Sequence, residues 1–139
     1  MGRFAANTTV PAERTQIEIK QAVMRYGADE FGVMESAARA AIQFRVKGLT
    51  VRIDVPLGDI TAQEVRQRWR ALLLAIRAKL EAVESQISTL ETEFMPFVVM
   101  PGGLTIGQHL LPRITQVAES GEIPKMLPAP PPVLRKVND

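Results

Sequence analysis

Cationic side chains gather in two parts of this sequence, at spacings that could bring them to phosphate groups. One set alternates along a β-prone segment, and the other flanks an amphipathic helical pattern. Phosphate contacts of this kind supply much of the affinity of proteins for nucleic acids. The formal net charge is only +2, so the positions of the cations, and not their total, carry the argument. The candidate nucleic-acid-binding residues are Arg45, Lys47, Arg52, Arg66, Arg68, Arg70, Arg77 and Lys79.

Residues that could do other chemistry are few. His109 is the only histidine, and it has no second ligand at metal spacing and no carboxylate within four residues. The chain has no cysteine, which excludes thiolate metal sites and a disulfide framework. The segment "MPGGLTIG" lacks the Gly-Lys-Ser/Thr ending of a phosphate-binding loop. The sequence therefore predicts no catalytic residues, no metal and no cofactor, and it argues against an enzyme.

An apolar stripe with alternating steps of four and three residues runs through residues 69–90, which is the a/d pattern of a heptad repeat. Basic residues flank its first half and acidic residues its second. A second copy packed antiparallel would match these halves, so the pattern predicts an antiparallel homodimer or another partner there. The alternative is that the stripe packs on the protein's own sheet. The candidate seam residues are Ile76, Leu80, Val83, Ile87 and Leu90.

The clearest β pattern is a hairpin over residues 42–55. A two-residue turn at Lys47 and Gly48 would place Phe44 opposite Val51 and bring the other apolar residues to the same face. The opposite face would be polar with a basic excess. Further strands are expected at 30–36 and, as a candidate fourth strand, at 97–100.

Three amphipathic helices are expected from the spacing of apolar residues. In the first, Ile17 and Met24 widen the apolar stripe. Capping-box pairs begin the other two helices. Pro112 lies inside the third helix and should kink it or split it. The expected ranges are 12–26, 62–92 and 106–119.

These elements predict an α+β fold, in which an antiparallel sheet of three or four strands packs with a first helix and a long second helix. A kinked third helix completes the single domain at residues 1–123. Residues 124–139 are a Pro-rich tail, interpreted as a strap over the surface or a polyproline ligand. No apolar run reaches the roughly 18 residues of a membrane span, and the N-terminus lacks a signal-peptide pattern. We therefore expect no membrane partner and a cytoplasmic location.

Three blocks of the sequence resemble a family of small uncharacterised proteins encoded by tailed phages and prophages. They are "NTTVPAERTQIEIKQAVMRYGADEFG", "RQRWRALLLAIRAKLEAVESQI" and "EFMPFVVMPGGLTIGQHLLPRI", with the motifs Val-Pro-x-Glu-Arg, Arg-Tyr-Gly-Ala, Arg-Trp-Arg-Ala and Leu-Thr-Ile-Gly. The resemblance covers most of residues 5–128. The Gly-Gly turn at 102–103, a shorter connection before the long helix and the Pro-rich C-terminus depart from the family pattern. The resemblance implies a phage origin and a life in the host cytoplasm, and it carries no activity over to any residue.

Two function classes follow from these patterns. The first is a non-enzymatic phage accessory protein that associates with DNA or RNA, in DNA metabolism or recombination, through its basic hairpin and helix surfaces. The alternative is a protein-binding module, such as an inhibitor of a host defence complex or an assembly adaptor, that uses the long helix and the tail. Surface geometry separates them. One merged basic groove favours nucleic acid, and basic residues on opposite sides favour a protein partner.

Overall fold

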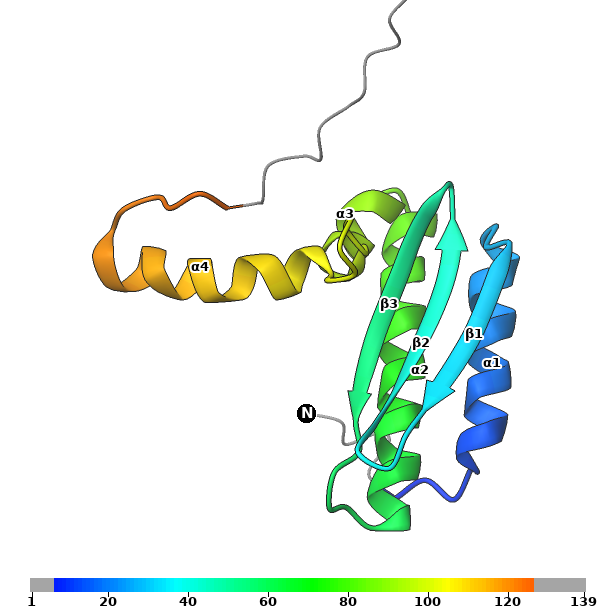
Figure 1. The fold of residues 1–139 in the computed structure, drawn as a ribbon. Coiled ribbons are helices and arrows are strands. Elements are labelled where there is room, and N and C mark those ends of the chain that lie inside the picture. Colours follow the sequence, from blue (N-terminus) through cyan, green and yellow to red (C-terminus); the bar gives the residue numbers. More distant parts are fainter. Residues whose placement is uncertain (1–6, 127–139) are drawn as a thin grey trace, which may run out of the picture.

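The computed structural model describes residues 7–126, which form an α+β fold with a three-stranded antiparallel sheet and four α-helices (Figure 1). The strand order is β1-β2-β3, so strands that follow one another in the chain are neighbours. Of the predicted Pro-rich tail, residues 127–139 lie outside the described residues. The elements are α1 (Ala12–Arg25), β1 (Glu30–Glu35), β2 (Arg39–Val46), β3 (Leu49–Pro56), α2 (Ala62–Glu84), α3 (Leu90–Phe94), the 3₁₀ helix η1 (Met95–Phe97) and α4 (Ile106–Ser120).

The hairpin of β2 and β3 confirms the predicted turn and register. Lys47 and Gly48 have φ angles of 50° and 76°, the left-handed pair that a two-residue type I′ turn requires. Phe44 therefore lies opposite Val51. Both side chains are buried, and the alternation of the strand brings the other apolar residues to the same face.

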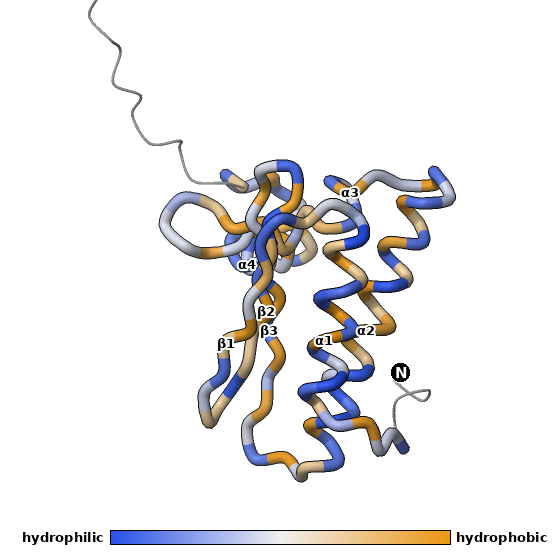
Figure 2. Tube along the Cα trace, turned by 90° about the vertical axis from the view of Figure 1, so that its right-hand side faces the viewer, coloured by the Kyte–Doolittle hydropathy of each residue, from blue (hydrophilic) through white to orange (hydrophobic). Residues whose placement is uncertain are grey.

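Two helices cover this apolar face and form a second layer against the sheet (Figure 1, Figure 2). From α2, Trp69, Leu73 and Ile76 enter the core, and none of them exceeds 1% exposure. From α1, Ile19 and Val23 are buried in the same cluster. The first half of the predicted heptad stripe is thus packed within the protein's own fold, as the alternative interpretation expects.

The apolar face of α1 is narrower than predicted. Ile17 and Met24 are 56% and 41% exposed, so the prediction that they widen the buried stripe is wrong. The buried positions of α1 are Thr15, Ile19 and Val23, at successive four-residue steps. A helix that packs beside one neighbour and over the edge of a small sheet buries one such row and leaves the far side in solvent.

The helix α2 ends at Glu84, so the prediction of one helix over 62–92 is wrong. Its start is as predicted, because the amide of Glu64 donates to the Thr61 hydroxyl at 3.1 Å and the Glu64 carboxylate accepts from the Thr61 amide at 3.0 Å. At its end, Gln86 adopts a φ of 67°, which interrupts the helix. The serines and threonine of residues 85–89 favour caps and turns over helix interiors, and Thr89 caps α3.

Residues 97–100 form no fourth strand in the part of the chain that the structure describes. Val98 and Val99 make only isolated bridges, to Val51 and Thr105. The amide of Val99 donates to the carbonyl of Thr50 at 2.8 Å, so this short segment still covers part of the outer edge of β3. Pro96, within η1, fixes the turn that precedes the segment and keeps it from extending further.

The helix α4 projects away from the two-layer body (Figure 1). Its predicted capping box is confirmed, because the Thr105 hydroxyl accepts from the Gln108 amide at 3.2 Å and the Gln108 side chain accepts from the Thr105 amide at 2.8 Å. Gly121 ends it in the left-handed conformation. The helix continues through Pro112, so of the two predicted outcomes, a kink or a split into two pieces, the split is wrong. The loss of one backbone hydrogen bond at the proline is tolerated by a helix that is capped at both ends.

Candidate functional site

The eight cations predicted to bind nucleic acid lie on two sides of the molecule. Arg45 and Arg52 alternate with the buried residues of β2 and β3, so they stand on the open face of the sheet. Lys47 lies in the hairpin turn. The five cations of α2 belong to the helix layer, on the other side of the core (Figure 2). The hairpin set and the helix set are therefore separated by the core and do not share one face.

Arg45 is held by two acidic residues of its own chain. Its Nε and Nη2 donate to the two carboxylate oxygens of Asp29, each at 3.0 Å, and Nη2 lies 3.2 Å from the Glu30 carboxylate. The hydrogen bond from Arg45 lowers the pKa of Asp29 below its ordinary value, and the same partner raises the pKa of Arg45. These contacts use the donors of Nε and Nη2, so only those of Nη1 remain for another acceptor.

Glu18 of α1 joins two arginines of α2. The Arg70 Nη1 atom lies 2.7 Å from the Glu18 carboxylate and the Arg77 Nη2 atom lies 3.4 Å from it. The side chain of Glu18 is about a fifth exposed, at 21%. The hydrogen bond from Arg70, together with the charges of both arginines, lowers the pKa of Glu18. Glu18 thus connects the two helices and occupies two of the predicted phosphate contacts.

Replacing Glu18 with glutamine should lower the free energy of unfolding at pH 7 by about 1–2 kcal/mol, because two guanidiniums lose a partly buried carboxylate. Since the folded pKa is depressed, this contribution is present above the ordinary pKa and is lost as pH falls through the folded value. Urea denaturation at pH 7 and near pH 3 measures the loss of unfolding free energy and its dependence on pH. The difference between wild type and E18Q should shrink at the lower pH.

The matched control for this prediction is Glu119→Gln, which removes an exposed acid of α4 that has no ion pair in residues 7–126. It should change stability by less than about 0.5 kcal/mol. An E18Q penalty of the same size at both pH values would show that the carboxylate charge is not what stabilises the helix pair.

Four more of the predicted cations also contact their own chain. Lys47 is the exception, because it makes no hydrogen bond or ion pair within residues 7–126. Lys79 also lies 5.5 Å from the centre of the Phe97 ring, within cation–π range. The hydrogen bonds are Arg52 Nη2 to Gln108 Oε1 at 3.1 Å, Arg66 Nη2 to Gln63 Oε1 at 2.7 Å, Arg68 to the Pro56 carbonyl, and Lys79 Nζ to the Glu93 carbonyl at 3.1 Å.

The predicted partner seam is not a continuous exposed surface. Ile76, Leu80 and Leu90 are buried in the core of the chain itself, and Val83 packs against that core while still partly exposed. Ile87 lies beyond the end of α2 and is 82% exposed. The seam is interrupted because the chain leaves the helix at residue 85 and returns Leu90 to the core from the separate helix α3.

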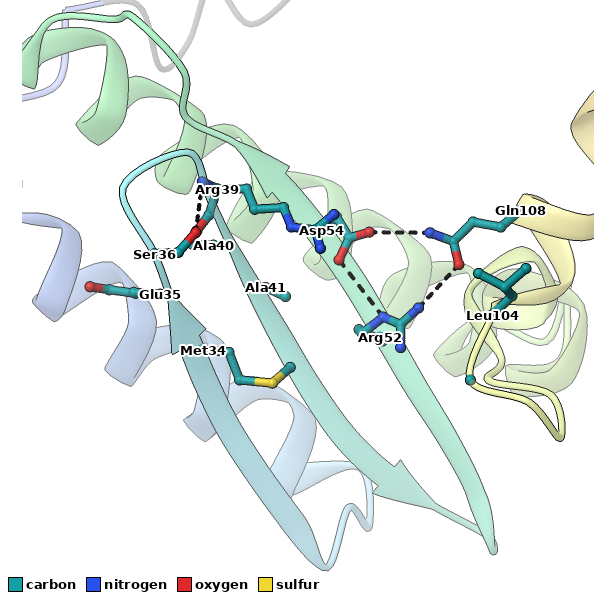
Figure 3. A pocket seen from close by; sticks show the side chains of 11 residues that line it. Met34, Glu35, Ser36, Arg39, Ala40, Ala41, Arg52, Asp54, Leu104 and Gln108 are labelled. Atoms are coloured by element: carbon teal, nitrogen blue, oxygen red, sulfur yellow. Dashed lines mark hydrogen bonds and ion pairs between the residues drawn. The ribbon is translucent and has the colours of Figure 1, made fainter.

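A hollow of about 530 Å³ lies on the open face of the sheet, where α4 begins (Figure 3). Met34, Ala41 and Leu104 give it an apolar lining. A polar network closes one side, in which Gln108 connects Arg52 and Asp54. The distances are 3.1 Å from Arg52 Nη2 to Gln108, 3.5 Å from Gln108 Nε2 to Asp54, and 3.8 Å from Arg52 Nε to Asp54. This network fixes the start of α4 against the sheet.

Among residues 7–126, no three His, Asp or Glu side chains are grouped to hold a metal ion.

The exposed apolar face of α4 is the most distinctive surface of the molecule. None of the helix's 15 residues is buried, although the first turns contact η1. Leu111 and Ile114 are 64% and 50% exposed. Gly107, which packs against Pro96, stands four residues before Leu111 on the same side of the helix. The side of α4 that touches the body therefore continues as an apolar stripe beyond the body's edge.

Leu111 and Ile114 are not among the residues predicted from the sequence, although their spacing carries a signal. Gly107, Leu111, Ile114 and Ala118 follow steps of four, three and four residues. Pro112 predicts a break in this helix. A short apolar stripe also does not show whether other parts of the same chain bury it. The exposure becomes visible only when the position of α4 relative to the sheet is known.

These features define an α+β protein in which an amphipathic helix projects from a two-layer body. No protein-family model matches the chain, and no curated protein or solved structure is significantly similar to it. Within the described residues, no helix combines the length and the apolar character that crossing a membrane requires.

Proposed function

We propose that this protein is a protein-binding module that docks a partner against the apolar face of α4. The observation that carries the proposal is the exposure of Leu111 and Ile114 on a helix with no buried residue. An isolated helix of about 15 residues is marginally stable in water, and amphipathic helices owe most of their stability to a covered apolar face. A partner that presents an apolar groove would supply that cover in the helix-in-groove mode.

The geometry of the cations favours this function over nucleic-acid association. Seven of the eight predicted phosphate contacts donate to acceptors of the same chain, and they are divided between two layers. A protein that neutralises phosphates needs its cations free and on one surface. A role as a phage accessory protein in the host cytoplasm, as an inhibitor or an adaptor, remains our hypothesis for the biological setting.

The double substitution Leu111→Glu with Ile114→Glu should abolish partner binding and leave the fold intact, because both side chains are exposed. The measurement is affinity capture of the tagged full-length chain from bacterial cells, with quantification of the protein that co-purifies at stoichiometric amounts. We expect capture to fall at least tenfold, a loss of about 1.4 kcal/mol or more. Circular dichroism should show an unchanged helix content.

The matched control is Gln116→Glu with Ser120→Glu, which adds the same charge to exposed positions on the opposite side of α4 from Leu111 and Ile114. It should capture the same partner as the wild type. Equal capture by both double variants, or no stoichiometric partner of the wild type, would contradict the proposal. Tight binding of labelled DNA or RNA at about 50 mM salt, falling steeply by about 200 mM, would instead support the nucleic-acid hypothesis.

A further inference from the structure

The strand β1 leaves an open row of backbone groups along one edge of the sheet. The amide of Ser36 donates to the carbonyl of Arg39 at 2.8 Å, which fixes the alternation of the β1–β2 ladder. Hydrogen-bonded pairs recur at every second residue of an antiparallel ladder. The even-numbered residues of β1, like Ser36, therefore bond to β2. The N–H and C=O groups of Phe31, Val33 and Glu35 therefore point away from β2, toward solvent.

The two edges of the sheet differ in how far other segments of the chain pair with them. The outer edge of β3 is partly covered, because the amide of Val99 donates to Thr50. No segment of residues 7–126 pairs with the outer edge of β1. Soluble proteins usually protect such an edge with a proline, a lysine or a bulge, and β1 has none of these over its six paired residues.

The charges at the two ends of β1 are already engaged by the protein. Glu30 lies 3.2 Å from Arg45, and the Glu35 carboxylate accepts from the side chain of Gln16 at 3.0 Å. Arg45 thus offsets the charge of Glu30, whereas the neutral amide of Gln16 leaves the charge of Glu35 available to a cation of an incoming strand. What remains is an extended edge with a weak negative character.

A hollow of about 240 Å³ lies beside this edge on the open face of the sheet. It exists because Gly32 has no side chain, and an added Cβ there would meet nothing within 4 Å. Met34 and Arg45 are among its other lining residues. A strand laid along β1 would place one of its own side chains opposite Gly32, over this hollow.

We propose that the open edge of β1 binds an extended segment of a partner protein as a fourth, antiparallel strand. The segment would carry a large apolar residue opposite Gly32 and a lysine or arginine opposite Glu35, three residues earlier in its sequence. The backbone groups of Phe31, Val33 and Glu35 supply affinity, and the two side-chain positions supply specificity. This site is separate from the face of α4 on which the proposed function rests.

A second copy of this chain does not fit the edge. The helix α1 lies against β1 on the inner face (Figure 1), with Gln16 bonded to Glu35. Two β1 strands paired about a two-fold axis would stand about 4.8 Å apart, whereas their α1 helices need roughly 8–10 Å between axes. An extended segment that brings no helix of its own avoids this overlap.

The test uses the full chain and a fluorescent peptide, acetyl-Thr-Lys-Thr-Val-Phe-Val-Lys-amide, designed for this register. Anisotropy should show saturable binding, and a scrambled peptide should bind at least roughly tenfold more weakly. Val33→Pro should reduce affinity for the designed peptide at least roughly tenfold, because it removes an outward N–H without touching the β1–β2 ladder. Val33→Thr, which keeps that N–H, should bind within about threefold of wild type.

Gly32→Val should weaken binding at least roughly fivefold by filling the hollow. The double variant Leu111→Glu with Ile114→Glu should bind the peptide normally, so failure of the α4 proposal and failure of this one are distinguishable. Absence of saturable binding up to about 1 mM, or equal binding by wild type and a folded V33P protein, would overturn the proposal.

Discussion

Replacing Trp69 with alanine should lower the free energy of unfolding by about 3–5 kcal/mol, the largest loss we expect from any single substitution. Trp69 is 1% exposed and is the largest fully buried side chain of the described residues. It lies in the core cluster with residues of the sheet and of the helices α1 and α2. Since a domain of this size has only about 5–15 kcal/mol of stability, the loss would remove a large share of it.

The measurement is urea denaturation followed by far-ultraviolet circular dichroism, because the chain has a single tryptophan and loses its fluorescence signal in the variant. Leu74→Ala is the matched control, since Leu74 belongs to the same helix and is 37% exposed. It should cost less than about 1 kcal/mol. If W69A fails to fold, Trp69→Phe should show an intermediate loss. A W69A loss below about 1 kcal/mol would mean that this side chain is not central to the core.

The hairpin and the first half of the long helix could be predicted from sequence because short-range rules determine both. A period of two residues on either side of Lys47 and Gly48 fixes register and face together. The Thr61–Glu64 pair fixes where α2 begins. The fold class, an antiparallel sheet with helices on one face, follows from these local assignments and from the order of the elements.

The partners of the basic residues could not be predicted, because they depend on tertiary neighbours. Glu18 stands 52 residues before Arg70 in the chain, and no spacing rule connects them. From the sequence alone, each arginine of α2 is therefore predicted to be available to a phosphate. Burial and pairing change that interpretation only when α1 is placed beside α2.

The second half of the seam shows how a periodic pattern can continue past the end of its element. Ile87 and Leu90 keep the heptad spacing, yet Ile87 is exposed and Leu90 reaches the core from α3. The helix α2 ends at Glu84, before both residues, and Gln86 adopts a positive φ directly after its end. Because glutamine is an ordinary helix former, the residue type at position 86 does not predict a helix end. Only the neighbouring serines favour a turn there.

The second large effect should come from Gly107→Val, which we expect to lower the free energy of unfolding by about 1–3 kcal/mol. A Cβ at this position would lie 2.9 Å from the carbonyl oxygen of Pro96 and 3.5 Å from its Cβ. A backbone carbonyl cannot move aside as a flexible side chain can, so α4 must shift away from η1. Ala118→Val adds bulk at an exposed position of the same helix, and it should cost less than about 1 kcal/mol.

Gly107 lies in the first turn of α4, where a glycine loses more backbone freedom on folding than an alanine would. Its presence is explained by the close approach to Pro96, which sets where α4 leaves the body and therefore where Leu111 and Ile114 are presented. Amide exchange should accordingly become faster along α4 in G107V while the exchange of the sheet stays as in wild type.

Affinity capture with the G107V variant then separates two kinds of partner. One that contacts α4 alone binds G107V normally, and one that contacts α4 together with exposed Met95 beside it is lost. Unchanged stability and unchanged exchange in G107V would contradict the role of this contact in holding the helix.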